Sequence, residues 1–103
     1  MSDPADVLRL QQAIRDLHGC DSRHLGSAIV HETFQGQPVW DGEVEIFELT
    51  GHPTAKQAYA WSHETDEGGR RYVAVLQVPP VNTPVDAVRA AIVAESKSRQ
   101  ERD

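Results

Sequence analysis

The sequence predicts a single small α+β domain with the element order α-β-β-α-β-α. Its three-stranded sheet consists of a β-hairpin plus a third strand, with helices packed mainly on one face. Apolar residues recur at helical spacing near both ends of the chain, two β-rich segments flank a short turn, and a further apolar segment follows Gly68–Gly69. The domain is expected to span residues 1–103, with a frayed tail from about residue 98.

Helices are predicted at the two ends of the chain, over about 3–18 and about 84–98. Asp3 is the expected N-cap of the first, and Gly19 is its stop signal. Thr83 is the expected N-cap of the second. The apolar stripes are Val7, Leu10, Ile14 and Leu17 in the first helix and Val85, Val88, Ala91 and Ile92 in the second.

Residues 26–35 and 38–50 are predicted to form a β-hairpin with Gly36–Gln37 as its two-residue loop. This register decides which side chains share a face, because a slip of one residue exchanges the two faces of a strand. The expected core face carries Ile29, His31, Thr33, Trp40, Gly42, Val44 and Ile46. The expected solvent face carries Val30, Glu32, Phe34, Val39, Asp41, Glu43 and Glu45.

The rest of the chain is predicted to add a middle helix over 53–64 and a third strand over 70–78. Pro53 suits the first turn of the helix. The third strand is apolar on both sides, with Tyr72, Ala74, Leu76 and Val78 on one face and Val73 and Val75 on the other. This pattern is typical of a strand that is central or covered on its second face.

Composition narrows the classes of partner. The net charge is −6 with neutral histidines, which argues against binding to nucleic acid or anionic membranes. No apolar run is long enough to span a bilayer, and the first residues lack the pattern of a signal peptide. Cys20 is the only cysteine, so an internal disulfide is excluded and a cytoplasmic location is expected.

The segment from residue 18 to residue 31 contains His18, Cys20, His24 and His31, which are residue types that bind zinc. Their spacing lacks the short paired-ligand motifs of zinc sites. We therefore predict no metal and no other cofactor.

Acidic residues alternate along residues 41–45, with Glu32 across the predicted hairpin. Carboxylates held close together act as general acids and bases or bind hard cations. Exposed charges on a strand more often protect an edge from aggregation, and this interpretation is favoured.

A candidate pocket is predicted where the middle helix meets the hairpin and the third strand, because aromatic and polar side chains converge there. Its residues are His31, Trp40, Tyr59, His63 and Tyr72. A structural role in packing is the favoured interpretation of this aromatic group. A histidine beside an apolar pocket also suits the binding or conversion of a small molecule near neutral pH.

Apolar residues on the second face of the predicted sheet favour a homodimer, because such a patch needs to be covered. They are Val30, Phe34, Phe47, Leu49, Val73 and Val75. The leading hypothesis is a non-catalytic interaction or regulatory domain that self-associates through this face. The alternative is a small-molecule-binding protein or enzyme with a histidine and aromatic pocket near Trp40 and His63.

Without the middle helix, the order helix, three strands, helix resembles that of the double-stranded-RNA-binding domain. That family binds phosphates through lysines at the start of its last helix. Here that start is TPVDAVRAAI, which has an aspartate and no lysine. The resemblance covers element order only and implies no function for this chain.

Overall fold

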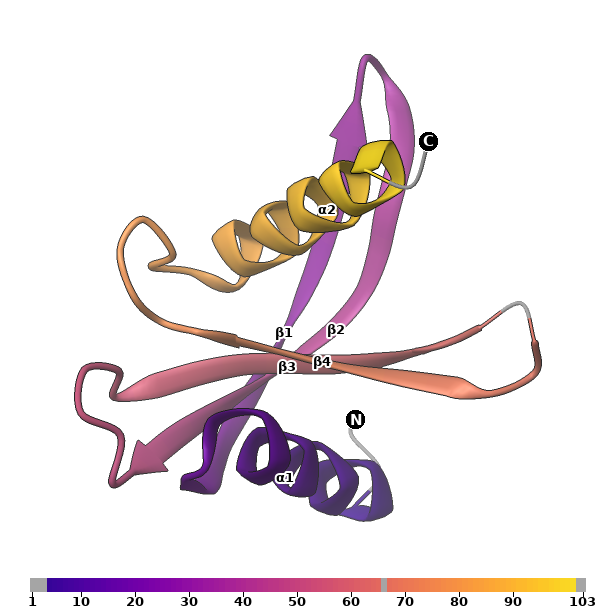
Figure 1. The fold of residues 1–103 in the computed structure, drawn as a ribbon. Coiled ribbons are helices and arrows are strands. Elements are labelled where there is room, and N and C mark those ends of the chain that lie inside the picture. The colour runs from indigo at the N-terminus through magenta and orange to yellow at the C-terminus, as the bar shows by residue number, and fades with distance from the viewer. Residues whose placement is uncertain (1–3, 66, 102–103) are drawn as a thin grey trace.

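The computed structural model describes residues 4–65 and 67–101, which form two helices and four strands (Figure 1). The strands make one antiparallel sheet in the order β1-β2-β3-β4. The broad α+β class is confirmed, but the three-stranded sheet and the order α-β-β-α-β-α are wrong. The elements are α1 (Pro4–His18), β1 (Asp21–Phe34), β2 (Gln37–Thr50), β3 (Gln57–Glu64), β4 (Arg70–Leu76) and α2 (Pro84–Glu101).

The two helices lie on opposite faces of the sheet, which contradicts the prediction that helices pack mainly on one face (Figure 1). Each helix covers its own apolar cluster. The buried residues of the α1-side cluster are Leu10, Ile14, Cys20, Phe47, Leu49, Ala55, Ala58 and Ala60. Those of the α2-side cluster are Val30, Val44, Tyr59, Trp61, Val81, Ala87 and Val88.

The predicted middle helix is wrong, because its second half is the interior strand β3. Along β3 the side chains alternate in size: Ala58 and Ala60 face α1, whereas Tyr59 and Trp61 face α2. Both faces are buried, so the strand lacks the alternation of apolar and polar residues that reveals a half-buried strand in a sequence. The closely spaced alanines favour a helix locally, and tertiary packing overrides that preference.

The loop before β3 replaces the predicted helix start. The Nδ1 atom of His52 accepts hydrogen bonds from the backbone N–H groups of Thr54, at 3.1 Å, and Ala55, at 2.9 Å. A side chain thus satisfies donors that a helix would leave open in its first turn. Pro53 lies inside this loop, where it was expected to begin the helix.

The hairpin turns one residue earlier than predicted, at Gln35 and Gly36 rather than Gly36–Gln37. Both turn residues have positive φ, at 53° and 77°, as a tight turn between twisted strands requires. A β-bulge then shifts the register between Glu32 and Thr33. The turn and the bulge together place Glu32, not Thr33, opposite Trp40.

This register exchanges the predicted faces of β1. Val30, expected on the solvent face, is 1% exposed, whereas Ile29, expected in the core, is 75% exposed. The prediction for β2 is correct at Val44, which is buried, but wrong at Glu45, which is 5% exposed. A bulge has this effect because one extra residue reverses the alternation of side chains beyond it.

The terminal helices and the last strand match the predictions more closely. Gly19 ends α1 with φ of 70°, and its N–H donates to the carbonyl of Arg15 at 2.9 Å. The hydroxyl of Thr83 accepts a hydrogen bond from the N–H of Asp86 at 3.1 Å, which confirms the predicted cap of α2. Asp3, the expected cap of α1, lies outside the described residues.

The helix α2 continues to Glu101, and the predicted fraying of the tail stays a prediction. None of the helices in the described part of the chain is long and apolar enough to cross a membrane.

The apolar patch that favoured a homodimer is divided between the two faces. Phe47 and Leu49 belong to the α1-side cluster, and Val30, Val73 and Val75 belong to or pack against the α2-side cluster. The side chain of Phe34 lies outside the described part. The chain's own helices therefore cover this surface, and self-association stays a prediction that needs another surface.

Candidate functional site

The candidate site is a cavity that lies mainly on the α2 side of the sheet, at the place where β2 and β3 separate, and that also reaches His18, Ala74 and Leu76 on the α1 side of β4. These strands pair only from Glu45–Glu48 to Gln57–Ala60. Beyond that point Trp40 of β2 and Trp61 of β3 meet across the gap, with ring centroids 5.6 Å apart and planes at 72°. This edge-to-face contact is a favourable geometry for two aromatic rings.

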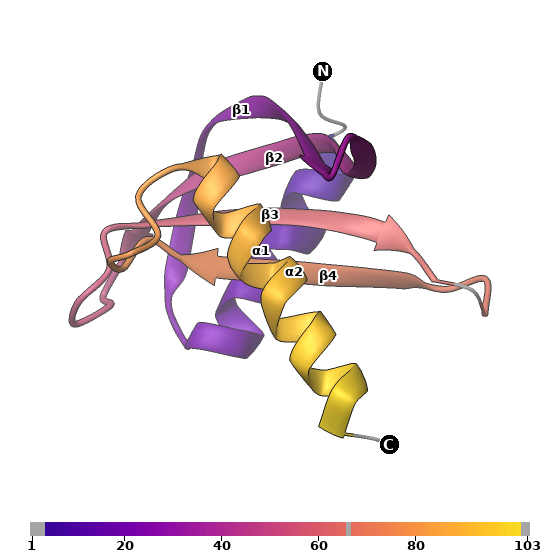
Figure 2. The same ribbon diagram turned by 90° about the horizontal axis from the view of Figure 1, so that it is seen from above.

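The cavity has a volume of about 900 Å³, within the range of small-molecule sites. Its walls come mainly from β3, β4 and residues 88–94 of α2, a helix that crosses the sheet obliquely (Figure 2). The walls are aliphatic and aromatic apart from three basic side chains. The lining residues are His18, Trp40, Trp61, His63, Arg71, Val73, Ala74, Val75, Leu76, Val88, Ala90, Ala91, Ile92 and Ala94.

A hydrogen-bonded group holds the start of α2 over the sheet. The Tyr59 hydroxyl donates to the carbonyl of Asn82 at 3.1 Å, and the amide of Gln77 donates to the Tyr59 oxygen at 2.9 Å. Tyr59 is 3% exposed, so its polar end needs these partners. The position of α2, which covers the cavity, therefore depends on the buried side chain of Tyr59 in β3.

The basic residues His63 and Arg71 are opposite each other on β3 and β4 and form one end of the cavity lining. Arg71 differs from the other arginines whose side chains the structure describes: it is the one with neither an ion pair nor a hydrogen bond. The other five bind acidic or hydroxyl partners, namely Arg9–Asp6, Arg15–Asp21, Arg23–Glu48, Arg70–Ser62 and Arg89–Glu32. A guanidinium group without a protein partner is available to a carboxylate or phosphate.

A second polar group lies on the α1 side, where Glu45 was expected to be solvated. Nε2 of His24 lies 2.8 Å from Oε1 of Glu45, and the His24 ring packs against Phe47 with centroids 5.3 Å apart. Buried carboxylates are uncommon unless they are paired, and His24 supplies such a partner. The favoured interpretation of the acidic ladder as a solvent-exposed edge is therefore wrong at Glu45.

This pair does not form a nucleophilic site. Ser22 lies two residues before His24 on β1, but its hydroxyl oxygen is fully buried and has no hydrogen-bond partner. A serine nucleophile needs a base within hydrogen-bond reach and access to substrate, and Ser22 has neither.

The histidine and cysteine group considered for zinc is dispersed. His18 reaches the carbonyl of Ala74 at 3.2 Å, Cys20 is buried in the α1-side cluster, and His31 pairs with Asp41 at 3.7 Å. Within the residues that the structure describes, no three metal-binding side chains come together.

Of the five residues predicted to form a pocket, Trp40 and His63 line the cavity and Tyr59 is buried in the adjoining cluster. The side chain of His31 is exposed on β1, and Tyr72 packs against the α1-side cluster. The bulge in the hairpin and the strand conformation of β3 explain this separation. Ligand binding at this group stays a prediction.

Sequence reasoning missed Trp61, Arg71 and the contribution of α2 to the cavity. The alternation of small and large residues in AYAW was the available signal that residues 58–61 form a strand with two buried faces. The two arginines after Gly68–Gly69 have a pattern that could bind a carboxylate or phosphate, but a turn into the following strand was the favoured interpretation. The position of Arg71 beside a cavity depends on the tertiary structure.

The chain matches no family model, no curated protein and no solved structure, so its function is inferred from the geometry of the cavity alone.

Proposed function

We propose that this protein is a non-catalytic binding domain for a small apolar organic anion. The observation that carries the proposal is the cavity under α2, which combines an apolar and aromatic wall with the unpartnered guanidinium of Arg71. The apolar part of the ligand packs against Trp40, Trp61 and Ile92. Its anionic group binds Arg71, with His63 beside it.

The composition of the wall supports binding rather than catalysis. None of the described residues that line the cavity is a serine, threonine, cysteine, aspartate or glutamate. The two histidines of the lining, His18 and His63, have no carboxylate in it to orient them, and no nucleophile of the lining lies next to them. The wall instead has the usual composition of a binding pocket, which is mostly apolar with a few polar groups that fix orientation.

The charge of the chain strengthens the argument for an anionic ligand. With a net charge of −6, the protein repels small anions on average, so selective binding depends on local positive groups. The end of the cavity is such a place, since Arg71 and His63 are adjacent there and Arg71 has no acidic neighbour within ion-pair distance in the described part.

Intrinsic fluorescence tests the proposal directly, because both tryptophans of the chain line the cavity. The probes are decanoate, decanol and decylammonium, which share one apolar chain. We expect all probes that enter to change the emission, with decanoate binding most tightly and decylammonium most weakly. Replacement of Arg71 by methionine should lower decanoate affinity about tenfold and leave decanol affinity unchanged.

The matched control is Arg70→Met, because Arg70 is the neighbouring residue on the same strand and bonds Ser62 on the other side of the sheet. It should bind all three probes like the unchanged protein. Equal affinities for decanoate and decanol would disprove the anionic part of the proposal. If none of the probes changes the tryptophan emission, the proposed binding function itself is wrong.

A further inference from the structure

Four stretches of strand edge lack a neighbouring strand within the described residues: the outer edges of β1 and β4, the part of β2 beyond its pairing with β3, and residues 61–64 of β3 on the side of β2. Proteins commonly protect such edges with charged residues, proline or bulges. β4 begins with two arginines and is followed by Pro79–Pro80, and residues 37–44 of β2 include Pro38, Asp41 and Glu43. The edges of β4 and β2 are thus protected, and at the unpaired stretch of β3 the Trp40 ring contacts Trp61.

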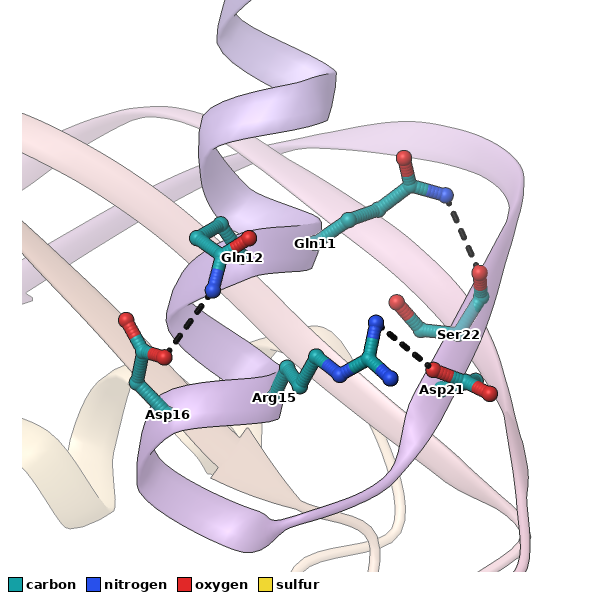
Figure 3. Close-up of polar contacts among 6 residues, drawn as sticks. All are labelled: Gln11, Gln12, Arg15, Asp16, Asp21 and Ser22. Atoms are coloured by element: carbon teal, nitrogen blue, oxygen red, sulfur yellow. Dashed lines mark hydrogen bonds and ion pairs between the residues drawn. The ribbon is translucent and has the colours of Figure 1, made fainter.

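The first part of the β1 edge is also closed, because α1 lies against it (Figure 3). The side-chain amide of Gln11 donates to the carbonyl of Ser22 at 3.0 Å, and Arg15 pairs with Asp21 at 3.5 Å. The Gln11 contact occupies the backbone carbonyl of Ser22, which another strand would need, and the Arg15–Asp21 pair lies beside it. A neighbouring strand is therefore excluded from the start of β1.

The following segment of β1, residues 25–31, is protected only at its first residue, where a β-bulge shifts the register between His24 and Gly26. Its sequence LGSAIVH contains no charged residue and no proline. Within the described part of the chain, no hydrogen bond from outside the hairpin reaches its backbone. Leu25 is 44% exposed and Ile29 is 75% exposed, so apolar side chains accompany this open edge.

We propose that the protein forms a symmetric homodimer by antiparallel pairing of residues 26–32 of β1 with the same segment of a second copy. A twofold axis at Ile29 places the two Ile29 side chains opposite each other. It places Ser27 opposite the partner's His31, and Gly26 opposite the partner's Glu32. None of these pairs joins like charges, and the two exposed isoleucines cover each other.

Symmetry favours this pairing over other contacts between copies. When β1 pairs with β1, the contact uses the same surface on both copies and closes after two chains. When β1 pairs with β4 of another copy, an open edge remains at each end and the assembly continues to grow. The charged start of β4 also makes that edge a poorer partner.

Sedimentation velocity from micromolar to near-millimolar protein tests the dimer. We expect reversible dimerisation that strengthens with added salt, because each copy carries a net charge of −6. Ile29→Lys should weaken dimerisation at least tenfold, since it places two like charges at the axis. The control is Leu8→Lys, because Leu8 is 65% exposed on α1 and is not part of the paired segment.

Cysteine cross-linking tests the register. In a hydrogen-bonded antiparallel pair, opposite Cα atoms are about 5.5 Å apart, a separation that a disulfide spans. Ile29→Cys should form an intermolecular disulfide under mild oxidation much faster than Leu8→Cys. The native Cys20 is buried and should not interfere.

A strict monomer at near-millimolar concentration would overturn the proposal. A dimer that both lysine variants weaken equally, or cysteine variants that cross-link equally fast, would also overturn it. If the monomer instead binds an extended peptide at this edge, the edge serves a foreign strand and the homodimer is wrong. The unfolding midpoints of dilute variants show whether each remains folded.

Discussion

The two faces of the sheet differ in how closely the helix on each face packs against it. On the α1 side, Leu10 and Ile14 pack over the small side chains of Ala58 and Ala60, so helix and sheet approach closely. On the α2 side, the helix contributes mainly alanine and valine over larger residues, and it crosses the sheet obliquely where β2 and β3 separate (Figure 2). The α1 side is thus the more closely packed face, whereas most of the cavity lies on the α2 side.

The largest expected difference is between two isoleucines that are each replaced by alanine. Ile14 is fully buried in the α1-side cluster, so Ile14→Ala should lower the free energy of unfolding by about 2–5 kcal/mol. Ile92 already borders the cavity, so Ile92→Ala should cost only about 1 kcal/mol, because fewer contacts are lost. Urea unfolding measures both; equal losses would show that the α2 side is as tightly packed as the α1 side.

The reverse experiment enlarges one alanine on each side. Ala60 has no exposed surface, so Ala60→Leu should overpack the α1 side and cost about 1–3 kcal/mol. Ala91→Leu should be neutral or stabilising, because its added carbons enter the cavity, and it should weaken decanoate binding. Thermal unfolding and the fluorescence titration measure these effects. A large loss of stability with Ala91→Leu would mean that the space is not open.

A smaller effect is expected for the polar pair on the α1 side. His24→Ala removes a hydrogen-bond partner from the buried carboxylate of Glu45, which should cost about 1–2 kcal/mol of unfolding free energy. His31→Ala is the control, because its pair with Asp41 is exposed and should contribute less than about 1 kcal/mol. If the two variants are equally stable, the buried pair does not contribute to the filled side.

Local signals predicted the terminal helices and β4 because their causes lie within a few residues. The hydroxyl of Thr83 caps α2 through its neighbour Asp86, and Gly19 stops α1 by adopting a positive φ. The alternation in residues 72–76 also placed each side chain on its correct face. These features depend on backbone chemistry that the sequence specifies directly.

The same local reasoning failed for β3 and for the faces of β1. The helical preference of the alanines in β3 yields to burial on both sides of an interior strand. In β1, a turn displaced by one residue and a single bulge were enough to bury Val30 and expose Ile29. The pocket predicted from those faces was consequently divided, although Trp40 and His63 still line one cavity.

The sequence by itself determined the capped helices at the two ends, the β-hairpin, an apolar last strand and the broad α+β class. Each depends on interactions between residues close together in the chain. Only the tertiary structure decided that β3 is a strand, that the helices cover opposite faces, and that Arg71 lies beside a cavity. These outcomes depend on which residues from distant parts of the chain bury their apolar side chains against each other. The free energy of that burial outweighs local secondary-structure propensity by several kcal/mol.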